Sequence, residues 1–153
     1  MIRKPYRSDW VQTDRNTFYP ASMDKHMAYD KGCQFCQIVN GEAEAEVILE
    51  QQDYLCILDK YPVTEGHSLV IPKSHIEQLE QIEDPAMFEF LERAHEEILN
   101  RYSPDGTNIG INNGAAAGQT VPHIHWHIIP RYNGDMDDPK GGVRGVIPEK
   151  QKY

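Results

Sequence analysis

The chain contains little cysteine. Of its 153 residues only three are cysteines, Cys33, Cys36 and Cys56. A disulfide scaffold is built from several pairs of cysteines, so three cysteines are too few, and an odd number cannot all be paired. Cys56 lies between Leu55 and Ile57 and is expected to be a buried apolar side chain. Cys33 and Cys36 have the spacing of a metal-binding or redox pair, and as a metal pair they need two further ligands.

Positive charge and long apolar runs are also scarce. Lysine and arginine number 15 against 24 aspartates and glutamates, a net charge of −9, which argues against binding long nucleic acid through its phosphates. The mean hydropathy is −0.64. No apolar run approaches the roughly 18 residues of a membrane span, and the N-terminus has no apolar signal core. We therefore expect a cytoplasmic protein without nucleic-acid or membrane partners.

The length of the chain fits one domain with a single core. Residues 1–31 show no sustained periodicity and are interpreted as an N-terminal extension. Residues 32–132 hold the regular patterns and form the predicted domain. Residues 133–153 form a C-terminal tail, whose glycines and Arg144 make it either a candidate specificity segment or a plain surface tail.

Short apolar runs and one helical pattern predict an α+β fold. Residues 84–102 carry apolar side chains at spacings of four, three and four, which is typical of an amphipathic helix that starts at Asp84. The remaining pattern predicts an antiparallel sheet of about five strands, with this long helix and a short one, and shows no alternation of strands and helices that would indicate a parallel sheet. The predicted strands are residues 46–50, 54–58, 68–72, 107–112 and 121–130.

Three histidines alternate with apolar residues in the last predicted strand. The two-residue period of a strand places His123, His125 and His127 on one face and the side chains between them in the core. Three titratable groups on one strand face bring no structural gain, so this face is predicted to be reactive. A nucleophilic imidazole and a catalytic three-histidine metal site both fit the alternation.

The loop before the histidines, residues 112–121, is rich in glycine and alanine. Small residues let the backbone amides approach a ligand, and Asn112, Gln119 and Thr120 add side-chain donors. Such a loop suits a phosphate, although a plain turn has a similar composition. An imidazole attacks phosphorus through an unprotonated nitrogen if an acceptor holds the proton on its other nitrogen, and nearby donors stabilise the charge that develops.

These segments resemble the histidine triad family of nucleotide hydrolases and transferases. The resemblance covers about residues 32–132 and includes every segment in the expected order. The segments are CQFCQI at 33–38, NGE at 40–42, LD at 58–59, GHSLVIPKSH at 66–75 and GQTVPHIHWHIIPR at 118–131.

The resemblance implies roles for two of the three histidines. His125, the middle one, corresponds to the nucleophile and would form a covalent nucleotidyl-histidine intermediate that water then hydrolyses. His127 would help to position the site. A related transferase branch has glutamine in place of the third histidine, so His127 favours hydrolysis over transfer to a sugar phosphate.

The resemblance also implies a nucleotide-binding set. Asp59 would contact the ribose hydroxyls, and His67 would support the histidines. Asn112 would lie near the scissile phosphate. The phosphate itself would be held by the loop that contains Gln119, Thr120 and Val121.

Zinc-containing bacterial-type members of the family indicate the two missing metal ligands. The resemblance maps them to His75 and His123, which would complete the set begun by Cys33 and Cys36. Four protein ligands close the coordination sphere, so such a zinc is structural. A redox role for the cysteine pair lacks the strand and helix that surround it in thioredoxin-type proteins.

The combined prediction is a nucleotide hydrolase that cleaves a phosphoanhydride or phosphoramidate bond. Its implied substrate is a purine nucleotide, either a dinucleoside polyphosphate or a nucleoside phosphoramidate, and the family implies a homodimer. Two alternatives remain at this stage. One is a nucleotide-binding regulatory module with little turnover, and the other is a metal-dependent hydrolase that uses the three histidines.

Overall fold

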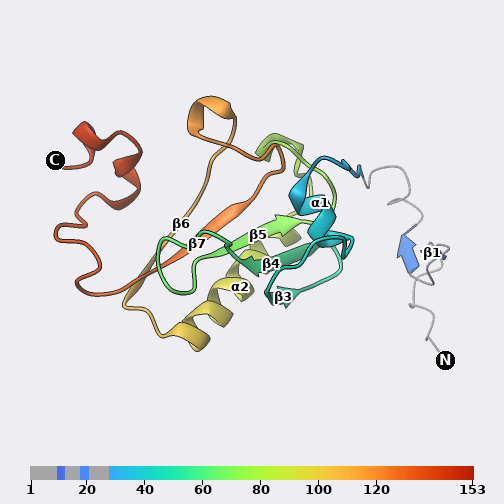
Figure 1. Cartoon of the computed structure of the whole chain (residues 1–153), viewed down its shortest axis with the longest axis horizontal. Helices are drawn as coiled ribbons and strands as arrows, with labels where there is room; N and C mark the ends of the chain where they lie inside the picture. Colours follow the sequence, from blue (N-terminus) through green and yellow to red (C-terminus); the bar gives the residue numbers. More distant parts are fainter. Residues whose placement is uncertain (1–9, 13–17, 21–27) are drawn as a thin grey trace.

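The computed structural model describes residues 10–12, 18–20 and 28–153, and its body is one antiparallel sheet with a helix on each face (Figure 1). Neighbouring strands pair in the order β3-β4-β5-β7-β6. The predicted α+β fold with five strands is therefore confirmed. The strands are β3 (Val47–Glu50), β4 (Tyr54–Leu58), β5 (Ser68–Pro72), β6 (Gly106–Ile111) and β7 (Trp126–Arg131).

The long helix α2 (Ala86–Tyr102) covers one face of the sheet. Asp84 accepts a hydrogen bond from the Ala86 amide at 2.9 Å, as expected at a helix start. The helix buries four apolar residues spaced three or four positions apart. The sequence pattern predicted Leu91 as one of them, but Leu91 is only partly buried and Phe90 is fully buried in its place. The core on this face consists mainly of Met87, Phe90, Ala94 and Ile98 against Cys56, Val70, Ile124 and Ile128.

The short helix α1 (Gln34–Val39) covers the opposite face. Successive side chains of a strand point to opposite faces, so β4 and β5 supply this second cluster with the residues between those that face α2. The cluster joins Phe35 and Cys36 of α1 to Leu55, Ile57, Leu69 and Ile71 of the sheet. The functional side chains described below gather on this α1 face.

Strand β7 begins at Trp126, five residues later than predicted. Residues 121–125 form an irregular segment, in which the Ile124 amide bonds to the Ile76 carbonyl instead of to a neighbouring strand. Of the three histidines only His127 lies in a strand, where it is paired with Leu69. The prediction that all three histidines lie in one strand is therefore wrong, because His123 and His125 precede β7. The predicted alternation is nevertheless confirmed, since Phe35 of α1 packs against both His123 and His125. The intervening Ile124, Trp126 and Ile128 are buried as predicted.

The described segments before residue 21 and after residue 133 are not strands of this sheet. Strands β1 (Trp10–Gln12) and β2 (Phe18–Pro20) pair with each other, and most of the predicted extension 1–31 lies outside the described residues. The tail forms two 3₁₀ helices, Gly142–Val146 and Pro148–Lys150, which Arg144 joins by donating to the Lys150 carbonyl at 2.9 Å. In the described parts of the chain we find no helix long and apolar enough to span a bilayer.

Candidate active site and metal site

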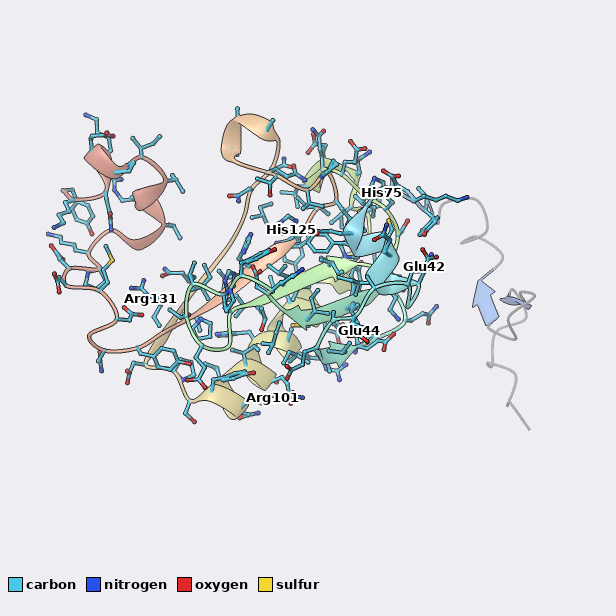
Figure 2. All side chains as sticks on the ribbon, viewed as in Figure 1. Glu42, Glu44, His75, Arg101, His125 and Arg131 are labelled. Atoms are coloured by element: carbon cyan, nitrogen blue, oxygen red, sulfur yellow. The ribbon has the colours of Figure 1, made fainter. Side chains whose placement is uncertain are left out.

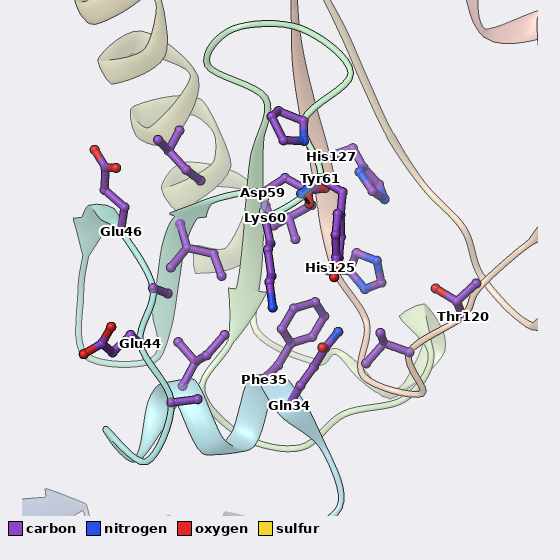
Figure 3. A pocket seen from close by; sticks show the side chains of 18 residues that line it. Gln34, Phe35, Glu44, Glu46, Asp59, Lys60, Tyr61, Thr120, His125 and His127 are labelled. Atoms are coloured by element: carbon purple, nitrogen blue, oxygen red, sulfur yellow. Dashed lines mark hydrogen bonds between the residues drawn. The ribbon is translucent and has the colours of Figure 1, made fainter.

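A pocket of about 1030 Å³ opens on the α1 face of the sheet (Figure 3). Its apolar wall consists of Phe35, Ile38, Ile57 and Leu69. His125 and His127 line the pocket together with Asp59, Thr120 and Val121. Figure 2 shows His125 and His75 on the side of α1, whereas Arg101 lies on the helix that covers the other face.

The contacts of His125 leave one of its ring nitrogens free. The Nδ1 atom lies 2.8 Å from the carbonyl oxygen of His123. A carbonyl oxygen only accepts hydrogen bonds, so Nδ1 carries a proton, and in the neutral tautomer the lone pair is on Nε2. The ring is 6% exposed, and the edge of Phe35 packs against it with ring centroids 5.1 Å apart. His125 is thus held in a fixed orientation, with its Nε2 available to a ligand in the pocket.

A hydrogen-bonded chain fixes the protons of His67 and His127. The amide of Val63 donates to His67 Nδ1 at 3.2 Å, so the proton of neutral His67 is on Nε2. His67 Nε2 lies 2.9 Å from His127 Nδ1 and donates to it. The proton of His127 is therefore on Nε2. His127 presents an N–H group to a ligand in the pocket, whereas His125 presents a lone pair.

Burial favours the neutral forms of these two rings. It lowers the pKa of His127 to about 4, and the nearby rings of His125 and His67 lower that pKa further. Burial also lowers the pKa of His67, although the carboxylate of Asp59 opposes the shift. Both rings are consequently uncharged at neutral pH, in agreement with the hydrogen-bond assignment.

The β4–β5 loop places Asp59 beside this chain. One carboxylate oxygen of Asp59 accepts a hydrogen bond from the Tyr61 amide at 2.8 Å, and the other lies 3.5 Å from His67 Nε2. The loop passes so close to the end of α2 that a Cβ on Gly66 would lie 2.7 Å from the ring of Tyr102. Gly66 also has a φ of +81°, so glycine is required there on both counts.

The loop of residues 112–121 is held together by the side chain of Gln119. Its Oε1 accepts from the Gly114 amide at 2.7 Å, and its Nε2 donates to the carbonyls of Glu77 and Val121. Gln119 therefore shapes the loop, while Thr120 and Val121 line the pocket. Asn112, Gln119 and His67 do not line it, and their predicted contacts with a nucleotide stay predictions.

Four predicted metal ligands meet behind the pocket. The candidate ligand atoms of Cys33, Cys36, His75 and His123 all lie within 4.8 Å of one another. His123 Nδ1 lies 3.4 Å from Cys33 Sγ and 3.6 Å from Cys36 Sγ. His75 Nδ1 lies 3.3 Å from Cys36 Sγ. Zinc–sulfur bonds of about 2.3 Å and zinc–nitrogen bonds of about 2.0 Å give tetrahedral edges of roughly 3.5 Å, which these distances match.

The protonation of this cluster also suits zinc. His123 Nε2 lies 2.8 Å from the Pro72 carbonyl and must donate to it, so Nδ1 faces the cysteines with a lone pair. His75 Nε2 points to a carboxylate oxygen of Glu77 at 3.6 Å, an orientation typical of metal-bound histidines. Burial raises the pKa of the Cys36 thiol to about 11 in the absence of a cation. Two cysteine sulfurs and two imidazole nitrogens around one point are the donor set of a zinc site.

Asp59, His67 and His127 also form a compact group of possible metal ligands. A metal on His67 Nε2 would move the ring proton to Nδ1, where it would face the Val63 amide, a second donor. This contact argues against a metal at His67. The group is better described as a hydrogen-bonded relay that orients His127.

Most residues that line the pocket were not predicted from the sequence, and three of them stand out. Phe35 lies between the two cysteines of the metal pair and was not assigned a role. Lys60 and Tyr61 directly follow Asp59, and both line the pocket (Figure 3). Only their position next to Asp59 could have indicated this, because an exposed lysine and tyrosine in a loop have no distinctive pattern.

The chain is similar in sequence to several known proteins. An adenylylsulfatase (HINT3) of Arabidopsis thaliana is 42% identical over 106 residues, which are 67% of this chain and 54% of that protein. An adenosine 5'-monophosphoramidase of Schizosaccharomyces pombe is 36% identical over 101 residues, covering 66% and 75%. An uncharacterized HIT-like protein of Methanocaldococcus jannaschii is 44% identical over 117 residues, covering 74% and 91%.

A solved structure and a family match complete the comparison. The crystal structure of a zinc-bound histidine triad family protein from Mycobacterium smegmatis is 43% identical and has a TM-score of 0.61, covering 69% of this chain and 79% of that one. The HIT domain matches residues 40–134, which include Asp59, the loop and all three histidines of the triad. The chain therefore belongs to the HIT (histidine triad) family.

Proposed function

We propose that the protein is a nucleotide hydrolase that works through a covalent intermediate on His125. The observation that carries this proposal is the hydrogen bond from His125 Nδ1 to the His123 carbonyl, which makes Nε2 the nitrogen that a neutral ring offers to a substrate in the pocket. His127 offers an N–H group in the same pocket, and the loop ending at Val121 offers further polar groups. A nucleophile and donors for a phosphate therefore lie together.

The reaction takes place in two displacements at phosphorus. The lone pair of His125 Nε2 forms a bond to the phosphorus atom, and the bond to the leaving group breaks with its electron pair. Water then attacks the phosphorus, the nitrogen–phosphorus bond breaks, and the electron pair returns to Nε2 while a proton is released. His127 donates a hydrogen bond to the charge that develops, and the His123 carbonyl holds the His125 ring throughout.

The substrate class that we propose is a purine nucleotide with a phosphoanhydride or phosphoramidate bond. Support comes from the relatives named an adenylylsulfatase and an adenosine 5'-monophosphoramidase, whose names describe cleavage next to an adenylyl group. Asp59 is proposed to accept hydrogen bonds from the ribose hydroxyls, since its carboxylate lines the pocket. Asn112, Gln119, Thr120 and Val121 are proposed to surround the phosphate, with His67 in support through His127.

We further propose that Cys33, Cys36, His75 and His123 hold one structural zinc ion. When bound, zinc would stabilise the thiolates and tie α1 to the segment before β7. The closed ligand set leaves no position for a substrate. It also takes His123 away from the pocket, which argues against a catalytic three-histidine metal site. We also propose a cytoplasmic homodimer, as the family implies, and sedimentation velocity of the purified protein tests the dimer.

The test of the function is an assay for release of nucleoside monophosphate. Purified zinc-loaded protein is incubated with adenylyl sulfate, adenosine phosphoramidate and dinucleoside polyphosphates. In parallel, a labelled substrate is quenched in acid at short times and the peptides are mapped under alkaline conditions. We expect turnover and label on the peptide that contains His125.

Two outcomes would contradict the proposal. If nucleotides bind but no substrate is cleaved, the protein is a nucleotide-binding regulatory module. If cleavage proceeds without any adduct and chelation stops it while the protein stays folded, the metal-dependent mechanism is correct.

A further inference from the structure

The catalytic pocket contains one cationic side chain that the proposed chemistry does not use. Lys60 is the single lysine or arginine among the described residues that line the pocket. The chain carries an excess of nine negative charges, yet no carboxylate in the described part of the chain lies within ion-pair distance of Lys60. Its ammonium instead lies 5.7 Å from the centre of the Tyr61 ring. An unpaired ammonium beside a binding pocket is available to a ligand.

The position of Lys60 indicates which part of a nucleotide it meets. Figure 3 shows its side chain running from the β4–β5 loop toward Phe35, on the other side of His125 from Thr120. The phosphate must lie at His125, and the proposed phosphate contacts lie on the Thr120 side. The apolar wall that would hold a base lies on the side of Phe35. Lys60 therefore faces the nucleoside rather than the leaving group.

The carboxylates that also border the pocket do not neutralise this cation. Glu44 and Glu46 lie at its far rim, and Figure 3 shows their carboxylates directed away from Lys60. Asp59 precedes Lys60, but its carboxylate is directed to the Tyr61 amide and to His67. At the end of the pocket that would hold the purine base, the polar group is thus the Lys60 ammonium, which only donates hydrogen bonds.

Purines differ in what they offer to such a donor. Guanine and hypoxanthine present two adjacent acceptors, O6 and N7, and lysine binds this pair well. Adenine presents N7 next to an amino group, which is itself a donor and is repelled by an ammonium. We propose that Lys60 is a specificity-determining residue that selects 6-oxopurine nucleotides over adenine nucleotides. The inference rests on the proposed function, because it assumes that the phosphate binds at His125.

The test measures the dissociation constants of GMP, IMP and AMP by calorimetry on the full-length, zinc-loaded protein. We expect GMP and IMP to bind about tenfold more tightly than AMP, the effect of one charged hydrogen bond. Lys60→Met should weaken GMP and IMP about tenfold and change AMP less than twofold. Lys73→Met is the matched control, since Lys73 pairs with Glu50 outside this pocket, and it should keep the preference.

The outcomes separate the inference from the function beneath it. Equal binding of the three nucleotides, or tighter binding of AMP, would overturn the inference alone. An equal loss for all three in Lys60→Met would also overturn it, because the ammonium would then act on the phosphate. If none of the three binds, the proposed function fails and the inference fails with it. Lys60 is exposed, so thermal melting should show that both variants fold normally.

Discussion

The described part of the chain contains two compact clusters of histidines with potential metal ligands, and the hydrogen bonds in the two clusters differ. In the metal cluster, His123 donates from Nε2 to the Pro72 carbonyl, so its other nitrogen faces two thiols with a lone pair. In the relay cluster, His67 accepts the Val63 amide at Nδ1, so its other nitrogen must donate. The distances within both clusters would allow a metal. The backbone group behind each imidazole decides whether the other ring nitrogen presents a lone pair, which a metal needs, or an N–H group.

The largest effect is expected from the imidazole that both clusters position. His125→Asn should lower the turnover number by about 10⁴-fold or more, because the covalent route loses its nucleophile. The zinc content and the melting temperature should stay close to those of the wild type. Single-turnover kinetics and metal analysis measure both properties. His95→Asn is the control, since His95 contacts Thr107 between α2 and β6, and a loss of turnover in that variant as large as in His125→Asn would remove the assignment.

Loss of the metal should affect stability more than chemistry. Cys33→Ser should reduce the bound zinc from about one per chain to near zero and lower the free energy of unfolding by about 3 to 5 kcal/mol. This is less than in small zinc-dependent domains, where the loss is on the order of 10 kcal/mol, because the sheet has its own core. Elemental analysis and urea unfolding measure the two effects.

Cys56→Ala provides the comparison for that variant. It also removes a fully buried thiol, but one outside the metal cluster, and it should retain the zinc. If carefully purified, reduced wild-type protein contains no metal, the proposal of a structural zinc at Cys33, Cys36, His75 and His123 is wrong. The proposal for His125 is unaffected.

The relay cluster should show the opposite pattern. His67→Asn removes the donor that fixes the proton of His127, so we expect kcat to fall about 10- to 100-fold while KM and zinc content change little. His67 is 4% exposed, so melting curves must accompany the kinetics. A variant that loses zinc together with activity would show that the two clusters are not separate.

The smallest expected effect is a pH dependence of stability from His127. Its pKa is about 4 in the folded protein and about 6.5 in an unfolded chain. Between these values the unfolded state binds more protons, so stability is lost as the pH falls from 6.5 toward 4. The ring is partly exposed, and we expect about 1 to 2 kcal/mol between pH 7 and pH 4.5 after allowing for solvent screening.

Urea unfolding of the wild type and of His127→Gln at both pH values measures this contribution. Both proteins lose any zinc-dependent stability in acid, so the difference between them isolates His127. An equal pH dependence in both would show that the folded protein does not hold His127 neutral.

Much of the fold follows from local patterns, and the site follows only in part. The helix after Asp84 and the strands β3 to β6 have clear periods, and the structure has them within two residues of the predicted ends. The start of β7 could not be predicted, because alternation looks the same in a strand and in the extended segment before it. What separates His123 from His125 is a pair of long-range contacts, to Pro72 and to the cysteines.

The proton positions are also invisible in the sequence. They depend on the Val63 amide and the His123 carbonyl, which are backbone groups that every residue type possesses. The role of Gln119 was hidden for the same reason, since its side chain is used by backbone groups of its own loop. Residue types indicate which chemistry a site can perform, and the backbone contacts determine which ring nitrogen of each histidine carries the proton.

The separation of the proposed metal ligands along the chain has a consequence for the time at which the proposed active site is completed during synthesis. Cys33 and His123 contact each other across 90 positions, so a chain leaving the ribosome offers two thiols and His75 long before the fourth ligand exists. The same short segment that completes the metal site also delivers His125, two residues later. In the proposed mechanism, a nascent chain is thus unable to carry a nucleotidyl group until nearly all of its sheet has been made, and the last step of assembly coincides with the first moment of reactivity.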